Sequence, residues 1–187
     1  EAFEVASQEK EAEINLIVEK VFMEARATLE NDATITINAV KDTTIVRGEN
    51  NADSMFVGST SSKIVIGGLN DVSTASGTNV QPTITLDGNR EYFEEKEIES
   101  GALVVSYGGQ VEINDNVIIK DNINTKVKYG GAVLLYNTSE PAKIDATIEN
   151  CSAEFGGGAI AVVGTLPESI GTIKNCSTSG NGGAIAF

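Results

Sequence analysis

The sequence contains no histidine and no tryptophan, and its 187 residues include only two cysteines and three prolines. Without histidine, it lacks the commonest general base and the commonest ligand of transition metals. Lys and Arg number 13 against 27 Asp and Glu, which gives a formal net charge of −14. This charge argues against binding to nucleic acid, which requires a basic surface, and against anionic membrane surfaces. No run of 18 apolar residues is present, so we expect no membrane-embedded segment.

The chain does contain a repeated phrase, in which glycine precedes alanine and a short aliphatic run. The phrase occurs at 100–109, 129–136, 156–163 and 181–187. The glycine before each alanine is Gly101, Gly131, Gly158 or Gly183. The steps are therefore 131−101=30, 158−131=27 and 183−158=25 residues. A period in the twenties indicates a solenoid, and short apolar runs of strand length make it a β-solenoid.

A second phrase repeats in phase with the first, reading VIIKDN, ATIENCS and GTIKNCS from residues 117, 146 and 171. We expect its asparagines to reverse the chain at one turn of each coil, where they can stack as a hydrogen-bonded ladder. These residues are Asn122, Asn150 and Asn175.

Two cysteines of this phrase, Cys151 and Cys176, are separated by 176−151=25 residues, the same step as the neighbouring glycines. They should stack on successive coils with Cβ atoms slightly too far apart for a relaxed disulfide. This geometry favours free thiols over a strained bridge and leaves the redox compartment open.

The first thirty residues differ from the rest. Apolar residues between Ile14 and Leu29 recur at helical spacing, which predicts an amphipathic helix over 7–30. A solenoid needs a cover over its first coil, so we interpret this helix as a cap, with partner binding as the alternative. The division is a capping helix over 1–31 and a solenoid over 32–187, which we expect to be cut short at its C-terminal end.

From residue 33 onward, Thr and aliphatic residues alternate in short runs separated by Gly, Asn and Asp. Alternation predicts half-buried strands with one set of side chains facing inward. The acidic run 90–100 interrupts the pattern, and we expect a solvated loop whose aromatics, Tyr92 and Phe93, pack back on the coil. The residues predicted to face inward are Ile35, Ile37, Ile64, Ile66, Ile84, Leu86, Val133, Ile148, Ile160 and Ile173, or their direct neighbours, since a slip of one residue would exchange the two faces.

The Gly-Gly-Ala phrase and the apolar-x-Asn phrase resemble repeats of chlamydial polymorphic outer-membrane proteins and autotransporter-like passenger domains. The order of segments is also similar to adhesin-like surface proteins of Gram-positive gut bacteria. The chlamydial phrase is Phe-x-x-Asn, whereas TIE precedes Asn150 and TIK precedes Asn175 here. The resemblance is therefore to surface β-helix adhesins as a class and to no single protein. It implies an all-β protein, a right-handed parallel β-helix of a secreted bacterial adhesin, exposed at the cell surface.

As such a protein, the chain would be a non-catalytic module that binds a host or bacterial surface glycan or protein, or a stalk. An open last coil would present unpaired backbone groups, so we also expect end-to-end self-association of this chain.

A polysaccharide lyase or hydrolase of the β-helix type is the alternative function. A hydrolase needs two carboxylates at a set separation, and a lyase needs calcium-binding acids with an Arg or Lys base. Candidate residues for such a site are Asp87, Arg90, Asp115 and Asp121. Because DGN, NDN and KDN are also ordinary turn sequences, we favour the binding module. We expect no cofactor, with calcium at the acidic turns as the alternative, since no EF-hand phrase is present.

Overall fold

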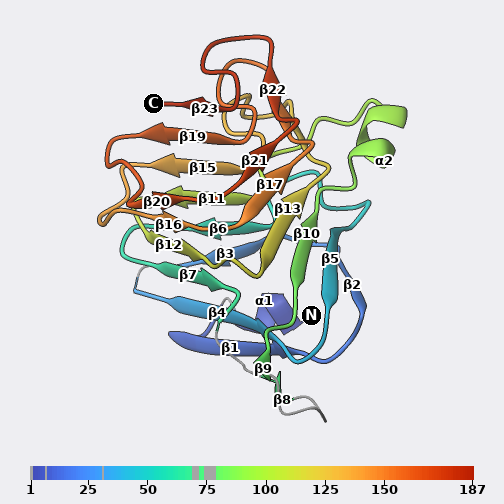
Figure 1. The fold of residues 1–187 in the computed structure, drawn as a ribbon, viewed down its shortest axis with the longest axis vertical. Helices are drawn as coiled ribbons and strands as arrows, with labels where there is room; N and C mark the ends of the chain where they lie inside the picture. The colour runs from blue at the N-terminus through green and yellow to red at the C-terminus, as the bar shows by residue number, and fades with distance from the viewer. Residues whose placement is uncertain (1, 7, 31, 69–71, 74–78) are drawn as a thin grey trace.

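The structure is a computed structural model of the chain and describes residues 2–6, 8–30, 32–68, 72–73 and 79–187. Its strands stack in layers from the N-terminal to the C-terminal end (Figure 1). Three parallel sheets of six strands each run the length of the stack, so the described residues form six coils. A fourth sheet of three strands accompanies the last three coils. The prediction of a mostly β protein built as a parallel β-solenoid is confirmed.

Each sheet takes one strand from every coil. The first sheet contains β1 (Glu11–Leu16), β4 (Thr34–Ala39), β7 (Lys63–Ile66), β12 (Gln110–Ile113), β16 (Lys143–Ile144) and β20 (Ser169–Ile170). The second contains β2 (Lys20–Met23), β5 (Thr43–Arg47), β10 (Ile84–Asp87), β13 (Val117–Lys120), β17 (Thr147–Glu149) and β21 (Ile173–Lys174). The third contains β3 (Ala27–Leu29), β6 (Phe56–Gly58), β11 (Val104–Tyr107), β15 (Val133–Tyr136), β19 (Ile160–Val163) and β23 (Ile185–Ala186). The fourth contains β14 (Ile123–Asn124), β18 (Ser152–Ala153) and β22 (Ser177–Thr178).

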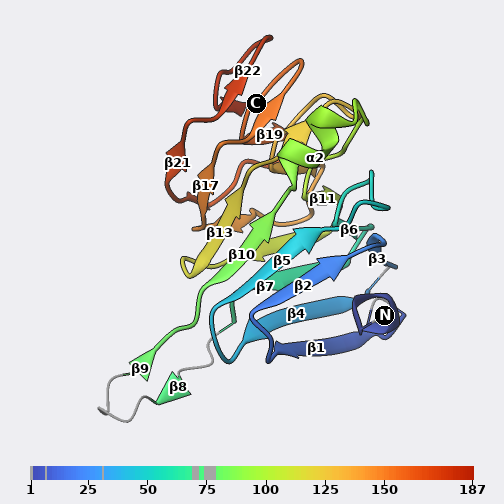
Figure 2. The same ribbon diagram turned by 90° about the vertical axis from the view of Figure 1, so that its right-hand side faces the viewer.

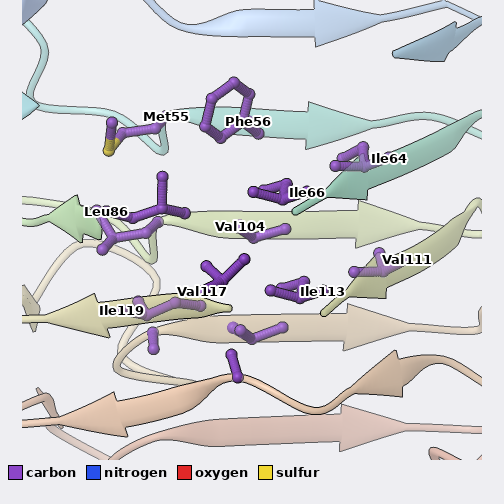
Figure 3. Packing of buried hydrophobic residues seen from close by; sticks show 14 of the residues in the cluster. Met55, Phe56, Ile64, Ile66, Leu86, Val104, Val111, Ile113, Val117 and Ile119 are labelled. Atoms are coloured by element: carbon purple, nitrogen blue, oxygen red, sulfur yellow. The ribbon is translucent and has the colours of Figure 1, made fainter. Parts of the chain in front are cut away.

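The core is a set of aliphatic ladders that run from coil to coil. In the second sheet, Ile45, Leu86 and Ile119 occupy one register position on successive coils, and Ile148 and Ile173 continue the ladder. Figure 3 shows such residues meeting between the sheets. Nine of the ten residues predicted to face inward are fully buried, and Ile173 is partly buried against the same core. The structure therefore places the named residues themselves on the inner face.

The repeated Gly-Ala phrase pairs in parallel as expected, with Val133 opposite Ile160. Glycine is needed here because a Cβ on Gly131 or Gly158 would overlap backbone atoms of the next coil. The predicted alignment of Gly101 with Gly131 is off by one residue. Val104 pairs with Val133, so Gly101, three residues earlier, lies opposite Gly130, and Leu103 takes the place of an alanine.

The prediction of a helix over 7–30 is wrong. These residues form β1, β2 and β3, the first coil of the solenoid, which pairs in register with the second coil. In β1, Ile14 pairs with Ile37 and only Leu16 is fully buried. The apolar residues between Ile14 and Leu29 fit a helical stripe, but pairing with the next coil satisfies their backbone groups and buries one face of each strand.

The observed N-terminal helix is α1 (Ala2–Ala6), which precedes the predicted one. Its Phe3 is buried, and its ring meets Phe56 edge-on with centroids 5.6 Å apart. Phe3 therefore packs into the N-terminal end of the core. Residues 1, 7 and 31 of the predicted capping segment lie outside the described residues.

The third coil carries two excursions, which lengthen its step to 110−63=47 residues between paired positions of β7 and β12. The first contains the antiparallel pair β8 (Val72–Ser73) and β9 (Asn79–Val80), which lies away from the stack (Figure 2). The second contains the helix α2 (Arg90–Glu95), where a loop was expected. Phe93 of α2 is buried and packs back on the coil as predicted. This excursion brings Arg90 beside the second sheet.

Candidate functional site

A charged cluster lies where β10 and β13 end and α2 begins. Asp87 and Lys120 are paired positions on the two strands, so their side chains project from the same face. Asp121 follows β13, and α2 returns Arg90 to the same place. These residues line a cavity of about 560 Å³. Three of the four predicted site residues, Asp87, Arg90 and Asp121, are therefore brought together.

The fourth predicted site residue, Asp115, lies elsewhere. It is exposed in the turn that precedes β13, whereas Asp121 follows the same strand. A strand of four residues thus separates the two carboxylates along the coil. Asp115 cannot act together with the cluster in a single reaction.

The two predicted carboxylates, Asp87 and Asp121, share one cation, although four carboxylates line the cavity against two cations. The Lys120 ammonium lies 2.7 Å from Asp121 and 3.3 Å from Asp87. Arg90 bonds Glu94 at 2.8 Å and also lies 3.4 Å from the Asn150 carbonyl. Each acid nearest the centre of the cavity therefore already has a cation as its partner.

The pKa shifts follow from these contacts. The hydrogen bond to Asp121 raises the pKa of Lys120, and the nearby Asp87 adds to the rise. Burial alone would raise the pKa of Asp121, but hydrogen bonds from Lys120 and Asn150 outweigh it and lower that pKa. A glycosidase needs a carboxylic acid held neutral by a raised pKa, and a lyase base must lose its proton. The lowered pKa of Asp121 disfavours the neutral acid, and the raised pKa of Lys120 disfavours the neutral base.

Metal binding has little support from side-chain placement. Among the residues that the structure describes, no three Asp, Glu or Cys side chains gather closely enough to hold a metal ion. Calcium at the acidic turns therefore stays a sequence-based alternative.

The predicted asparagine ladder is present, with one member changed. Asn175 donates to Asn150 at 3.4 Å, and Asn150 donates to Asp121 at 3.1 Å. All three residues have φ between 50° and 54°, the left-handed region that Asn and Asp tolerate. Asn122, predicted as the third rung, is instead buried one position further on, and its amide donates to the Gly101 carbonyl at 3.1 Å.

Cys151 and Cys176 are free thiols, as the sequence favoured. Counting from the paired residues Glu149 and Lys174, they share one register position on the fifth and sixth coils, and Asn122 holds that position on the fourth. Cys151 is buried and Cys176 is half-buried. The predicted stacking of the two cysteines is therefore correct.

A second surface feature, which the sequence did not predict, lies on the outer face of the third sheet. Tyr107 and Tyr136 are paired positions on β11 and β15, and Val163 continues the row on β19. These three strands lie one above another (Figure 1). The two tyrosine rings are 6.3 Å apart and tilted by 57°. A row of large side chains therefore follows the solenoid axis across three coils.

The segment that leads into β15 adds residues to the hollow that this row lines. It carries Tyr129, whose ring meets Phe155 edge-on at 5.9 Å, and Val127. The buried Leu134 and Ala161 also line it. We call this hollow of about 380 Å³ the aromatic groove; its lining is Tyr107, Val127, Tyr129, Leu134, Tyr136, Ala161, Val162, Val163, Ala186 and Phe187.

The large side chains that line the aromatic groove include several that are exposed and lie outside the solenoid core. Tyr107, Tyr129 and Tyr136 are each 46–47% exposed, as is Phe155 beside them. Gathered apolar side chains of this kind mark binding surfaces more often than scattered ones do. The available signal was the tyrosine at the outward parity of two repeats, together with Tyr129, the first residue of the repeated phrase at 129–136.

In the described part of the chain, no helix has both the length and the apolar character needed to cross a bilayer. Comparisons of the chain with protein-family models, curated proteins and solved structures find no match.

Proposed function

We propose that this chain is a non-catalytic binding module of a bacterial cell-surface β-helix protein, and that it binds a neutral glycan in the aromatic groove. The observation that carries the proposal is the row formed by Tyr107, Tyr136 and Val163, with Tyr129 in the lining of the same hollow. The rings are exposed and fixed by the strands that bear them. Rigid aromatic side chains give contact area at a small cost in conformational entropy.

Ring chemistry favours a sugar. A pyranose has an apolar C–H face that can stack on an aromatic ring, and its hydroxyl groups can bond phenol groups or bridging water. Tyrosine offers both an apolar face and a polar tip. Because the groove follows the solenoid axis across three coils, it suits an extended oligosaccharide.

Charge favours a neutral glycan. Among the described side chains that line the groove, none carries a charge. The net charge of −14 also repels acidic polysaccharides over the length of the coil. A neutral chain meets neither an unpaired charge in the groove nor this repulsion.

The charged cluster gives the rival enzyme less support. It does bring Asp87, Arg90 and Asp121 to one cavity. However, Lys120 holds both carboxylates in ion pairs, and Asp115 lies apart. We therefore assign this cluster a structural role, tying α2 to the second sheet.

Location and handedness belong to the same proposal. The repeated Gly-Ala phrase resembles bacterial surface solenoids, so we place the module outside the cell. We also infer a right-handed coil, because crossover connections between parallel strands are right-handed in nearly all known cases.

Affinity electrophoresis tests the function. The chain is run through native gels that contain a neutral β-glucan, a mannan or an arabinoxylan, with polygalacturonate as the acidic comparison. We expect retardation by a neutral polysaccharide, its loss in Tyr107→Ala/Tyr136→Ala, and its retention in Phe22→Ala. Phe22 is a matched control because it is 55% exposed on β2, away from the groove.

The same polysaccharides, incubated with the chain and calcium, test for catalysis through reducing ends and unsaturated products. We expect no products. Turnover that disappears in Asp87→Asn would replace the binding module with the enzyme, and the absence of retardation by every neutral polysaccharide would overturn the glycan proposal.

A further inference from the structure

Cys151 and Cys176 lie directly opposite one another on adjacent coils. Ser152 and Ser177, which follow them, are paired positions, and the Ser177 N–H donates to the Cys151 carbonyl at 3.0 Å. When Cys176 is ionised, the Cys151 thiol can donate a hydrogen bond to its thiolate. Neighbouring strands bring both the Cα atoms and the parallel Cβ atoms to about 4.8 Å, so the Cα separation lies within the range that disulfides span and the Cβ atoms must approach by a few tenths of an ångström. A small inward movement of the two side chains would therefore allow the bond to form.

The two sulfurs differ in what surrounds them. Cys151 is fully buried, and its Sγ lies 3.3 Å from the Glu149 carbonyl. Cys176 is half-buried, and its Sγ lies 3.3 Å from the Lys174 carbonyl. The hydrogen bond between the thiols lowers the pKa of Cys176 to about 7, and together with burial it raises that of Cys151. Cys176 is therefore the accessible and more readily ionised sulfur, the two properties of an attacking thiol.

A buried cation lies on the same side of the core. Arg47 is fully buried, and one of its nitrogens donates to the Gly101 carbonyl at 2.6 Å. The guanidinium carbon of Arg47 lies 5.4 Å from the centroid of the Phe93 ring, which belongs to α2. Burial lowers the pKa of Arg47 to about 10, and interaction with Cys151 offsets part of this effect.

We propose that Cys151 and Cys176 are a thiol pair that forms a reversible disulfide by exchange with a small-molecule disulfide. The Cys176 thiolate attacks one sulfur of the oxidant, the sulfur–sulfur bond breaks, and one thiolate leaves. Cys151 then loses its proton to that thiolate or to water, and its sulfur attacks Cys176 Sγ. The second thiolate leaves, so the two cysteines lose two electrons and the small disulfide becomes two thiols.

The bond would fasten the sixth coil to the fifth. Each coil of a solenoid contacts only its neighbours, so the last coil opens most easily. A disulfide across 176−151=25 residues limits that opening by restricting the unfolded chain. We expect the midpoint of thermal unfolding to rise by roughly 5–10 °C on oxidation.

The test uses the folded chain in buffers of oxidised and reduced glutathione at pH 8, quenched with N-ethylmaleimide and measured by intact mass. At high oxidised glutathione we expect the chain to lose two hydrogens, take up no maleimide, and yield a Cys151–Cys176 peptide on non-reducing digestion. Dithiothreitol should reverse all three changes. A glutathione adduct that persists on the wild-type chain, or two thiols that stay unmodified, would overturn the proposal.

Single variants assign the two roles. Cys151→Ser should stop at a glutathione adduct on Cys176, whereas Cys176→Ser should stay unmodified while folded. Circular dichroism checks that each variant is folded, and the wild-type measurement stands without them. Equal reactivity of the two cysteines in the folded variants would contradict the order of attack.

Discussion

Tyr107 and Tyr136 hold paired positions on β11 and β15, and their ring centroids lie 6.3 Å apart. The strands fix the spacing of the rings, while about half of each side chain faces solvent. Neither ring fills the core, so either can be removed without leaving a cavity. Binding by this surface can therefore be tested separately from folding.

Lys120 should stabilise the fold through its ion pairs with Asp87 and Asp121. Lys120→Met leaves two carboxylates close together without their cation. We expect a loss of about 0.5–1 kcal/mol in the free energy of unfolding at pH 7, because all three side chains are partly solvated. Urea unfolding measures it, with Lys41→Met as the control, since its partner Glu19 is 86% exposed.

This loss should depend on pH. The pKa of Asp121 is lowered in the folded chain, so its contribution is complete above the ordinary value of 3.8 and disappears as pH falls through the folded value. The difference between wild type and Lys120→Met should therefore stay constant down to about pH 4 and shrink as the pH falls further, towards the lowered pKa of Asp121. A difference that also stays constant below about pH 4 would contradict the assigned ion pairs.

Gly158 should tolerate no side chain. A Cβ at this position would overlap the backbone of Ser177 on the next coil, which cannot move without separating the coils. We expect Gly158→Ala to lower the free energy of unfolding by about 2–4 kcal/mol. Gly156→Ala is the matched control, because its Cβ would meet mainly the Tyr129 ring at 3.2 Å, which can shift. Equal losses in the two variants would contradict the close approach.

The reactivity of Cys176 should follow its lowered pKa. In the folded chain this pKa falls from 9.0 to about 7, because Cys151 donates a hydrogen bond to the thiolate. The rate of alkylation by iodoacetamide should reach half its maximum near pH 7 in the folded chain and near pH 9 in urea. Because ionisation is favoured in the folded state, stability from this group should increase as pH rises from 7 to 9. An unchanged midpoint in Cys151→Ala, which has no donor at this position, would show that the hydrogen bond from Cys151 is not the cause.

The C-terminal strands should mediate self-association. The edge strands at this end of the sheets are β20, β21, β22 and β23. Three isoleucines within them, Ile170, Ile173 and Ile185, are only partly buried. We propose that copies of this chain pair there, and that salt promotes the association by screening the charge of −14. Light scattering should show a mass that rises with concentration. Ile185→Glu should abolish the rise and Leu166→Glu, in an exposed turn, should not, whereas a strict monomer at all concentrations would contradict the proposal.

The inner face of the coils could be predicted because it depends on local sequence. Alternation identifies Ile35 and Ile37 as one side of a strand, and the repeated phrase extends that assignment to Ile148 and Ile160. The first coil could not be predicted in this way. Ile14 and Leu29 fit both a helix and a set of strands, and only pairing with residues more than twenty positions away decides between them.

The candidate site depends on register and excursions, which one sequence does not reveal. Asp121, rather than Asn122, accepts the hydrogen bond from Asn150 and is the third member of the ladder. The turn in this coil therefore comes one residue earlier than the repeated asparagines indicated. The position of Arg90 depends on the path of α2. Tyr129 and Tyr136 line one hollow because the chain between them returns along the third sheet, which depends on how the coil closes.

The most direct test of the account is isothermal titration of the folded chain with an oligosaccharide cut from the neutral polysaccharide that retards it. We predict a single binding site on the wild-type chain. In Tyr107→Ala/Tyr136→Ala the dissociation constant should be weaker by a factor of roughly ten or more, since each aromatic contact contributes about 0.5–1.5 kcal/mol. Phe22→Ala should bind as wild type. Unchanged affinity in the folded double variant would contradict the assignment of binding to the aromatic groove.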